Sequence, residues 1–189
     1  MAMRTRFRED KTTQAAARLI QLCGGRMAYL KLIKLLYLAD REALIRWGRP
    51  ITYDTYVAMK HGPVLSGTLD VIKGRVRSSG EGGWHRHIER VGDYDVQVRT
   101  GAVPATDLIS PVEEGLLVEI AGKYGRLGKW DLVRLVHGFP EWVDPETMNQ
   151  RALPIDTRDI LRGAGFDEDD IDAIQDEIEA VAYADRILD

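Results

Sequence analysis

The segment from Met27 to Trp47 constrains the fold most strongly, because as a helix it is apolar around nearly its whole circumference. Between Ala28 and Ala39 the only charged residues are Lys31 and Lys34. A helix with so few polar positions is usually buried on all sides. We therefore predict a central helix over residues 27–47, ended by Gly48, around which the rest of the chain packs.

The remaining sequence carries six further helical patterns and one hairpin pattern. Tyr94, Val96 and Val98 alternate with polar residues after a Gly92-Asp93 turn, which predicts a β-hairpin over residues 84–100. We predict a mainly α fold, a compact single-domain bundle of six or seven helices with a small β-hairpin insert. The six further helices are expected at 11–22, 63–72, 110–124, 129–136, 156–161 and 167–188. We expect residues 1–10 to form a flexible basic arm, and residues 11–189 to form the domain.

Three of these helices begin with recognisable capping residues. Ser110, Pro111 and Glu113 combine a capping box with proline at the first helical position. Asp156 and Asp167 are aspartates at the starts of the last two helices, where a side-chain oxygen can accept from free backbone N–H groups. These signals predict where the carboxyl-terminal helices start.

The charge of the chain is unevenly distributed. The net charge is −4, but residues 155–189 hold twelve acidic and three basic residues, whereas residues 1–154 hold an excess of basic residues. Such asymmetry bears on partners rather than on the fold. Two interpretations stay open: a solvated acidic helix, or an acidic end that meets a basic surface on another protein.

No motif in the sequence defines a catalytic mechanism. His85 and His87 would share one face of a strand, but two ligands are fewer than a metal site usually has. Asp40 and Glu42 are two residues apart, so on a helix they do not face each other. Cys23 is the single cysteine, and it has no evident base nearby. We predict no enzyme activity, no metal and no cofactor.

The composition argues against binding to nucleic acid and against insertion into a membrane. Arg4, Arg6 and Arg8 could contact phosphate, but the chain has a pI near 5.6. No apolar run approaches the ~20 residues that span a bilayer. Because the amino-terminal residues also lack the apolar core of a secretory signal, we expect a cytoplasmic location.

Three stretches together resemble a known family. They are LIKLLYLADREALIRWGRPITYDTYVAMKHGPVLSGTLDVIKG at residues 32–74, ISPVEEGLLVEIAGKYGRLGKWDLVRLVHGFPEWVDP at 109–145, and IDTRDILRGAG at 155–165. In order and spacing they are similar to the SocA-like Panacea domain, a phage-associated family. Its most specific parts here are KLLYLADR, GRPITYDTYVAMKHGPV and HGFPEW.

The resemblance implies an antitoxin with a helical fold and a small β-element. Its implied partner is a cognate toxin protein that it neutralises by direct contact, and a bacterial ATP-dependent protease is a second implied partner if the chain acts as a proteolytic adaptor. Two alternatives remain, a phage-associated enzyme that acts on nucleic acid and a DNA-binding regulator.

A neutralising protein needs a rigid surface, which makes residues 51–64 the candidate contact region. Because proline suits the first position of a helix, we expect a helix to start at Pro63, with its free N–H groups facing a partner. The alternative is that this region only packs against the central helix and turns the chain. The candidate partner-binding residues are Tyr53, Tyr56, Lys60, His61, Gly62, Pro63 and Trp142.

Overall fold

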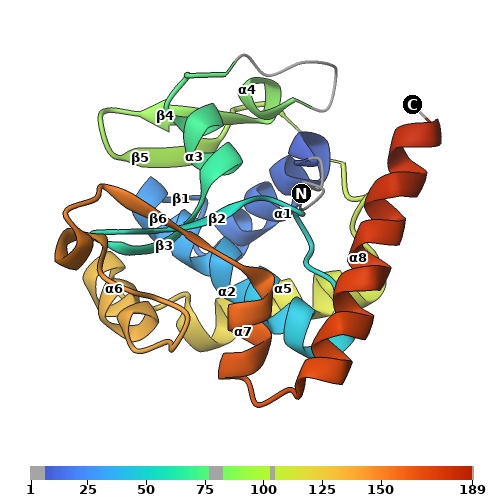
Figure 1. The fold of residues 1–189 in the computed structure, drawn as a ribbon. Helices are drawn as coiled ribbons and strands as arrows, with labels where there is room; N and C mark the ends of the chain where they lie inside the picture. Colours follow the sequence, from blue (N-terminus) through green and yellow to red (C-terminus); the bar gives the residue numbers. More distant parts are fainter. Residues whose placement is uncertain (1–6, 77–82, 103–104, 189) are drawn as a thin grey trace.

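The central position of the apolar helix is confirmed. The computed structural model describes residues 7–76, 83–102 and 105–188, and in it α2 (Tyr29–Trp47) runs through the middle of the molecule (Figure 1). Eleven of its residues between Leu32 and Leu44 are buried. It ends, as predicted, at Gly48, which takes the left-handed conformation with φ of 69°. The helix starts two residues later than predicted, because Met27 belongs to a strand instead.

The helices around α2 make the chain mainly α, as predicted. Helices α1, α5, α6 and α7 all pack on α2. Within the described residues there are eight α-helices and one short 3₁₀ helix. Besides α2 they are α1 (Glu9–Leu22), α3 (Ser66–Ile72), α4 (Trp84–His87), α5 (Pro111–Tyr124), α6 (Lys129–His137), η1 (Pro145–Met148), α7 (Thr157–Gly163) and α8 (Glu168–Leu188).

The expected basic arm is partly structured. Glu9 and Asp10 already belong to α1, the backbone N–H of Arg8 donates to the carbonyl of Thr52, and Phe7 packs against the core. Residues 1–6, which include Arg4 and Arg6, lie outside the described residues.

The predicted hairpin is present but shorter, and it belongs to a three-stranded sheet. Strands β4 (Ile88–Val91) and β5 (Asp95–Val98) pair around Gly92, and β1 (Arg26–Ala28) pairs with β5 to complete the order β1-β5-β4. Residues Trp84–His87 form a helical turn rather than the start of the hairpin. His85 and His87 therefore do not share a strand face as the sequence suggested.

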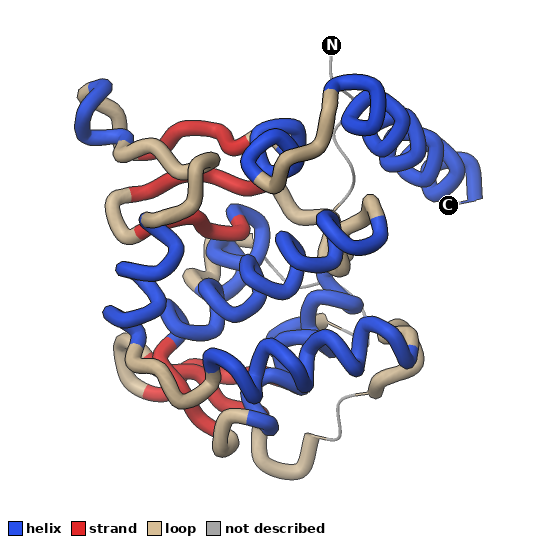
Figure 2. Tube along the Cα trace, turned by 90° about the horizontal axis from the view of Figure 1, so that it is seen from below, coloured by secondary structure: helices blue, strands red, loops and turns tan. Residues whose placement is uncertain are grey.

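A second three-stranded sheet was not predicted. Strands β2 (Tyr56–Met59), β3 (Gly62–Leu65) and β6 (Ala152–Ile155) lie in the order β3-β2-β6, and all pairs are antiparallel. The strand content therefore exceeds a single hairpin insert. In Figure 2 the strands form two separate groups with helices between them.

The predicted helix start at Pro63 is wrong. Pro63 lies in β3 opposite Ala58, and Gly62 lies opposite Met59, so Lys60 and His61 form the two-residue turn of a hairpin. Proline fixes its own φ, and that value is compatible with a strand as well as with a first helical turn. The helix that follows begins only at Ser66.

The capping predictions for the carboxyl-terminal helices are confirmed. Ser110 and Glu113 form a complete capping box on α5. The Asp156 carboxylate accepts from the N–H of Arg158 at 2.9 Å, and the Asp167 carboxylate accepts from the N–H of Asp170 at 2.9 Å. These caps start α7 and α8 where the sequence places them.

Helix α8 is anchored to the domain by one apolar face. Ile171, Ile178 and Ala182 are buried, while the helix runs along the outside of the molecule (Figure 1). Across the described residues, no helix combines the length and the apolar character that crossing a membrane requires.

Candidate functional site

The segment between α2 and β2 is fastened to the core by Asp40. This carboxylate is fully buried and accepts hydrogen bonds from the backbone N–H groups of Ile51 and Thr52, each at 3.0 Å. It also accepts from the hydroxyl of Thr52 and, at 2.9 Å, from the hydroxyl of Tyr56. Burial raises the pKa of Asp40 to about 6, although these hydrogen bonds oppose the shift. The segment therefore leaves α2 in one fixed conformation.

Asp54 caps helix α3, so the N–H groups expected to face a partner are already occupied. Its carboxylate accepts from the N–H groups of Gly67 and Thr68 at 2.8 Å each. The Thr68 hydroxyl donates to it at 2.7 Å. The start of α3 therefore offers no exposed backbone donors of the kind the sequence suggested.

Tyr53 and Tyr56 both lie in the core. Tyr53 is 8% exposed and has a φ of 53°, and Tyr56 is 3% exposed. The Tyr56 ring packs edge-on against the Tyr37 ring of α2, with 5.6 Å between their centroids. Neither ring offers a broad exposed area, and this placement is the one expected if the segment packs against the central helix.

Gly62 and Pro63 are buried against α2 and α6. A Cβ at position 62 would lie 2.7 Å from Val136 Cγ2, and Gly62 has a φ of 90°. The buried ammonium of Lys34 donates to the Pro63 carbonyl at 2.5 Å. Burial lowers the pKa of Lys34 to about 7. The hairpin strand β3 is thus seated tightly on the central helix.

Trp142 also supports this hairpin. Its indole stacks on His137 with 3.8 Å between centroids and a 6° angle between planes. Its Nε1 donates to the carbonyl of Met59, the last residue of β2, at 3.2 Å. Trp142 is half-buried, so its principal contacts are within the chain.

The HGFPEW motif is held on α2 by a buried ion pair. Glu141 accepts from the Tyr37 hydroxyl at 2.8 Å and from Arg41 Nε at 2.7 Å. The Arg41 guanidinium also lies 4.1 Å from the centroid of the Phe139 ring. The three motifs that carry the family resemblance therefore meet on α2 in two polar clusters, one around Glu141 and one around Asp40. The contact between the Tyr37 and Tyr56 rings joins the two clusters, and local sequence patterns did not reveal this arrangement.

Of the seven candidate residues, Lys60 and His61 form the part that projects to solvent. Lys60 pairs with Glu146 of η1 at 3.0 Å, and this bond raises its pKa. The His61 ring meets the Trp130 ring edge-on at 5.3 Å. Trp130, at 49% exposure, was missed because it occurs in an ordinary helical pattern. We call Lys60, His61, Trp130 and Glu146 the turn surface.

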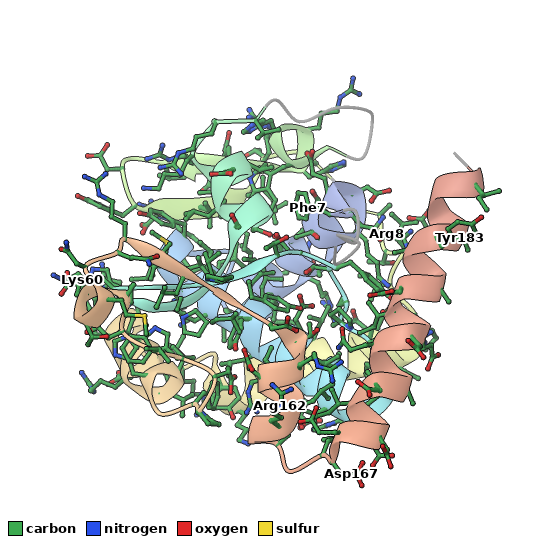
Figure 3. All side chains as sticks on the ribbon, viewed as in Figure 1. Phe7, Arg8, Lys60, Arg162, Asp167 and Tyr183 are labelled. Carbon is green, nitrogen blue, oxygen red and sulfur yellow. The ribbon has the colours of Figure 1, made fainter. Side chains whose placement is uncertain are left out.

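The turn surface and the acidic helix lie on opposite sides of the molecule. Figure 3 shows Lys60 at the left edge of the view, Tyr183 of α8 at the right, and Asp167, which caps α8, at the lower right. The two regions that the sequence offered for partner contact are therefore separated by the body of the domain.

The described residues contain no group of three or more histidine, cysteine, aspartate or glutamate side chains that could hold a metal ion. Cys23 is half-buried, and burial raises the pKa of its thiol. Asp40, considered above as half of a carboxylate pair, is committed to holding the chain after α2. Most buried polar side chains of this site are bonded within the fold, whereas, in the part of the chain that the structure describes, His137 Nε2 is buried without a hydrogen-bond partner.

The chain belongs to the family described as antitoxin SocA-like, Panacea domain, whose sequence model matches residues 32–143. This range covers most of α2, the hairpins of both sheets, α5, α6 and Trp142. It includes Lys60, His61 and Trp130 of the turn surface but not Glu146. No curated protein and no solved structure matches the chain. The family supports an antitoxin role for this protein.

Proposed function

We propose that this protein is an antitoxin that neutralises a cognate toxin by binding it directly through the turn surface. The observation that carries the proposal is the contrast within the β2–β3 hairpin. Its strands are seated on Lys34, Val136 and Trp142, whereas Lys60 and His61 at its turn are exposed. Pre-ordering a contact surface reduces the entropy lost on binding.

The proposed mechanism requires no chemical step. Glu141 is paired with Arg41, and Asp40 is bound by Thr52 and Tyr56. A protein that acts by holding a partner needs rigidity rather than a reactive group. A toxin held on the turn surface would be inactive because its own working surface is covered. As an adaptor, the same complex would also present the toxin to an ATP-dependent protease.

The test is co-expression with the product of the neighbouring reading frame. We expect rescue of growth and co-purification of the two proteins. Lys60→Ala combined with His61→Ala should weaken the complex and leave the melting temperature nearly unchanged, because both side chains are exposed. Lys123→Ala combined with His85→Ala removes the same residue types from exposed positions on α5 and α4, and should leave binding intact.

Two results would count against the proposal. Rescue of growth without a stable complex would point to the regulator or enzyme alternatives. A loss of stability in the Lys60 and His61 variant, with unchanged affinity per folded molecule, would return those residues to a purely structural role. For the adaptor function, toxin half-life should shorten when antitoxin and protease are both present.

A further inference from the structure

Exposed aromatic side chains continue the turn surface across the molecule. Tyr94 is 65% exposed and Trp130 is 49% exposed. The Lys129 ammonium lies between them, 5.9 Å from the Tyr94 ring centroid and 5.6 Å from that of Trp130. The His61 ring also meets the Trp130 ring edge-on. We call Tyr94, Lys129, Trp130 and His61 the aromatic row.

The row is assembled from three elements whose backbones are fixed. The Tyr94 carbonyl accepts from the N–H of Tyr29, the first residue of α2, at 2.8 Å. The N–H of Gly128, which precedes α6, donates to the Asp131 carboxylate at 3.1 Å. His61 belongs to the seated hairpin. Large aromatic side chains held exposed on a rigid frame are typical of binding hot spots rather than of ordinary surface.

Lys129 carries an uncompensated charge within this row. Its ammonium contacts the two rings, and it takes part in no ion pair among the described residues. By contrast, the neighbouring cations Lys60 and Arg134 are paired with Glu146 and Asp131. Lys129 also stands at the first position of α6, where the positive end of the helix dipole opposes a cation. Within residues 7–76, 83–102 and 105–188, no carboxylate is paired with it.

We infer that the aromatic row receives a segment of the toxin in which a carboxylate is flanked by aromatic or aliphatic side chains. Covering Lys129 without an opposite charge would leave a desolvated ammonium, so a partner that buries the rings must supply the anion. The apolar neighbours of that carboxylate cover Tyr94 and Trp130. This inference rests on the proposed function and specifies which chemistry the toxin presents.

Two other occupants fit the row less well. A second copy of the chain, facing the first across a two-fold axis, would bring two uncompensated lysines together. A nucleic-acid strand could stack on the rings, but such sites line the backbone with a positively charged groove, and Lys129 is the single lysine or arginine in the row. Both remain as outcomes of the experiment.

The experiment measures the affinity of the neighbouring-frame toxin for full-length variants. We expect Lys129→Met and Trp130→Ala each to weaken binding by about tenfold or more, as truncated hot-spot residues do. Lys129→Glu should weaken binding further, since the new carboxylate would face the carboxylate of the toxin. The matched controls are Lys123→Met, whose ammonium lies 5.1 Å from the Tyr124 ring, and Tyr183→Ala, whose ring is 57% exposed on α8. Both controls should bind normally, and all variants should keep the wild-type melting temperature.

A peptide array covering the toxin sequence tests the chemistry directly. Wild type should bind a peptide with an acidic residue between apolar ones, and changing that residue to its amide should abolish binding. Wild-type affinity in Lys129→Glu overturns the inference alone, whereas failure of the wild-type chain to bind the toxin overturns the proposed function and the inference with it. The inference is also overturned if the wild-type chain binds a single-stranded oligonucleotide and Lys129→Glu does not, because the row would then bind nucleic acid. It is likewise overturned if the wild-type chain is a dimer in solution and Lys129→Glu is not, because the row would then bind a second copy.

Discussion

The Tyr37 hydroxyl donates to the Glu141 carboxylate at 2.8 Å, joining two motifs that are 104 residues apart in the chain. The Glu141 side chain is 0% exposed, and its ion-pair partner Arg41 is 14% exposed. Removing one member of a buried pair is more damaging than its net contribution suggests, because the other member remains without a counter-charge. This pair therefore fixes the HGFPEW segment, and with it Trp142, against α2.

Glu141→Gln should destabilise the fold by about 3–5 kcal/mol, because the Arg41 charge is left without its partner. Chemical denaturation at pH 7 measures this change. Glu119→Gln is the matched control, since it breaks an Arg46 pair of similar geometry that is exposed. The control should change stability little, and equal losses in both variants would contradict the structural role of Glu141.

Gly62→Ala should be far more damaging than Gly165→Ala. Both glycines have a φ near 90°, at 90° and 93°, so both substitutions carry the backbone strain of a left-handed conformation, about 1–2 kcal/mol. At position 62 the new Cβ would also lie 2.7 Å from Val136 Cγ2, whereas at position 165 it meets no atom within 4 Å. The overpacking should add about 1–3 kcal/mol. Comparing denaturation midpoints of the two variants checks this, and similar midpoints would show that β3 is not tightly seated.

Lys34 should make stability rise with pH above neutrality. Its pKa falls from an ordinary 10.5 to about 7 in the fold, so between those values the unfolded chain binds the additional proton. The free-energy cost of burying the Lys34 ammonium is therefore largest at and below pH 7, and it decreases as the pH increases. Because one pKa unit corresponds to about 1.4 kcal/mol, the rise should reach a few kcal/mol by about pH 9.

Lys34→Met should flatten that pH dependence, since no proton is then taken up on unfolding at this position. The measurement is the free energy of unfolding at several values between pH 7 and about pH 9. That range lies above the pKa of Asp40, whose raised value makes stability fall as pH rises from 3.8 to about 6. Parallel profiles for wild type and variant would show that Lys34 stays charged in the fold.

The acidic helix should have little influence on toxin binding at the turn surface, because it lies on the opposite side of the molecule (Figure 3). Asp169, Asp176, Glu177 and Glu179 are exposed and take part in no ion pair among the described residues. Neutralising all four as amides should leave the melting temperature and the association rate nearly unchanged, measured by stopped-flow at low and physiological salt. A slower rate with a weaker salt dependence would mean that the toxin contacts α8.

Deleting residues 167–189 would not answer the same question. The deletion removes Ile171, Ile178 and Ala182 from the core, and it uncovers Gly48, where a Cβ would lie 3.4 Å from Ile174. Loss of binding in that variant would reflect loss of packing, so amide substitutions are the informative change.

The sequence alone determined the features that depend on neighbouring residues. The apolar segment up to Ala39 had to be buried, because Lys31 and Lys34 are its only charged residues after Ala28 and leave no broad polar face. Ser110, Asp156 and Asp167 each cap the helix that directly follows. Alternation around Gly92 placed the β4–β5 hairpin, and the ordered motifs identified the family.

The tertiary structure alone decided which of the polar residues are exposed to a partner and which are buried and hold the fold together. Lys60 and Tyr56 are equally plausible contact residues in the sequence, but Tyr56 is bound to Asp40 while Lys60 lies at an exposed turn. Pro63 is compatible with a helix start and with a strand, and pairing with Ala58 selects the strand. The hydrogen bonds of Tyr56 and Lys60 join residues 16 and 86 positions apart in the chain. A local pattern carries no information about which distant group will satisfy a buried donor or acceptor.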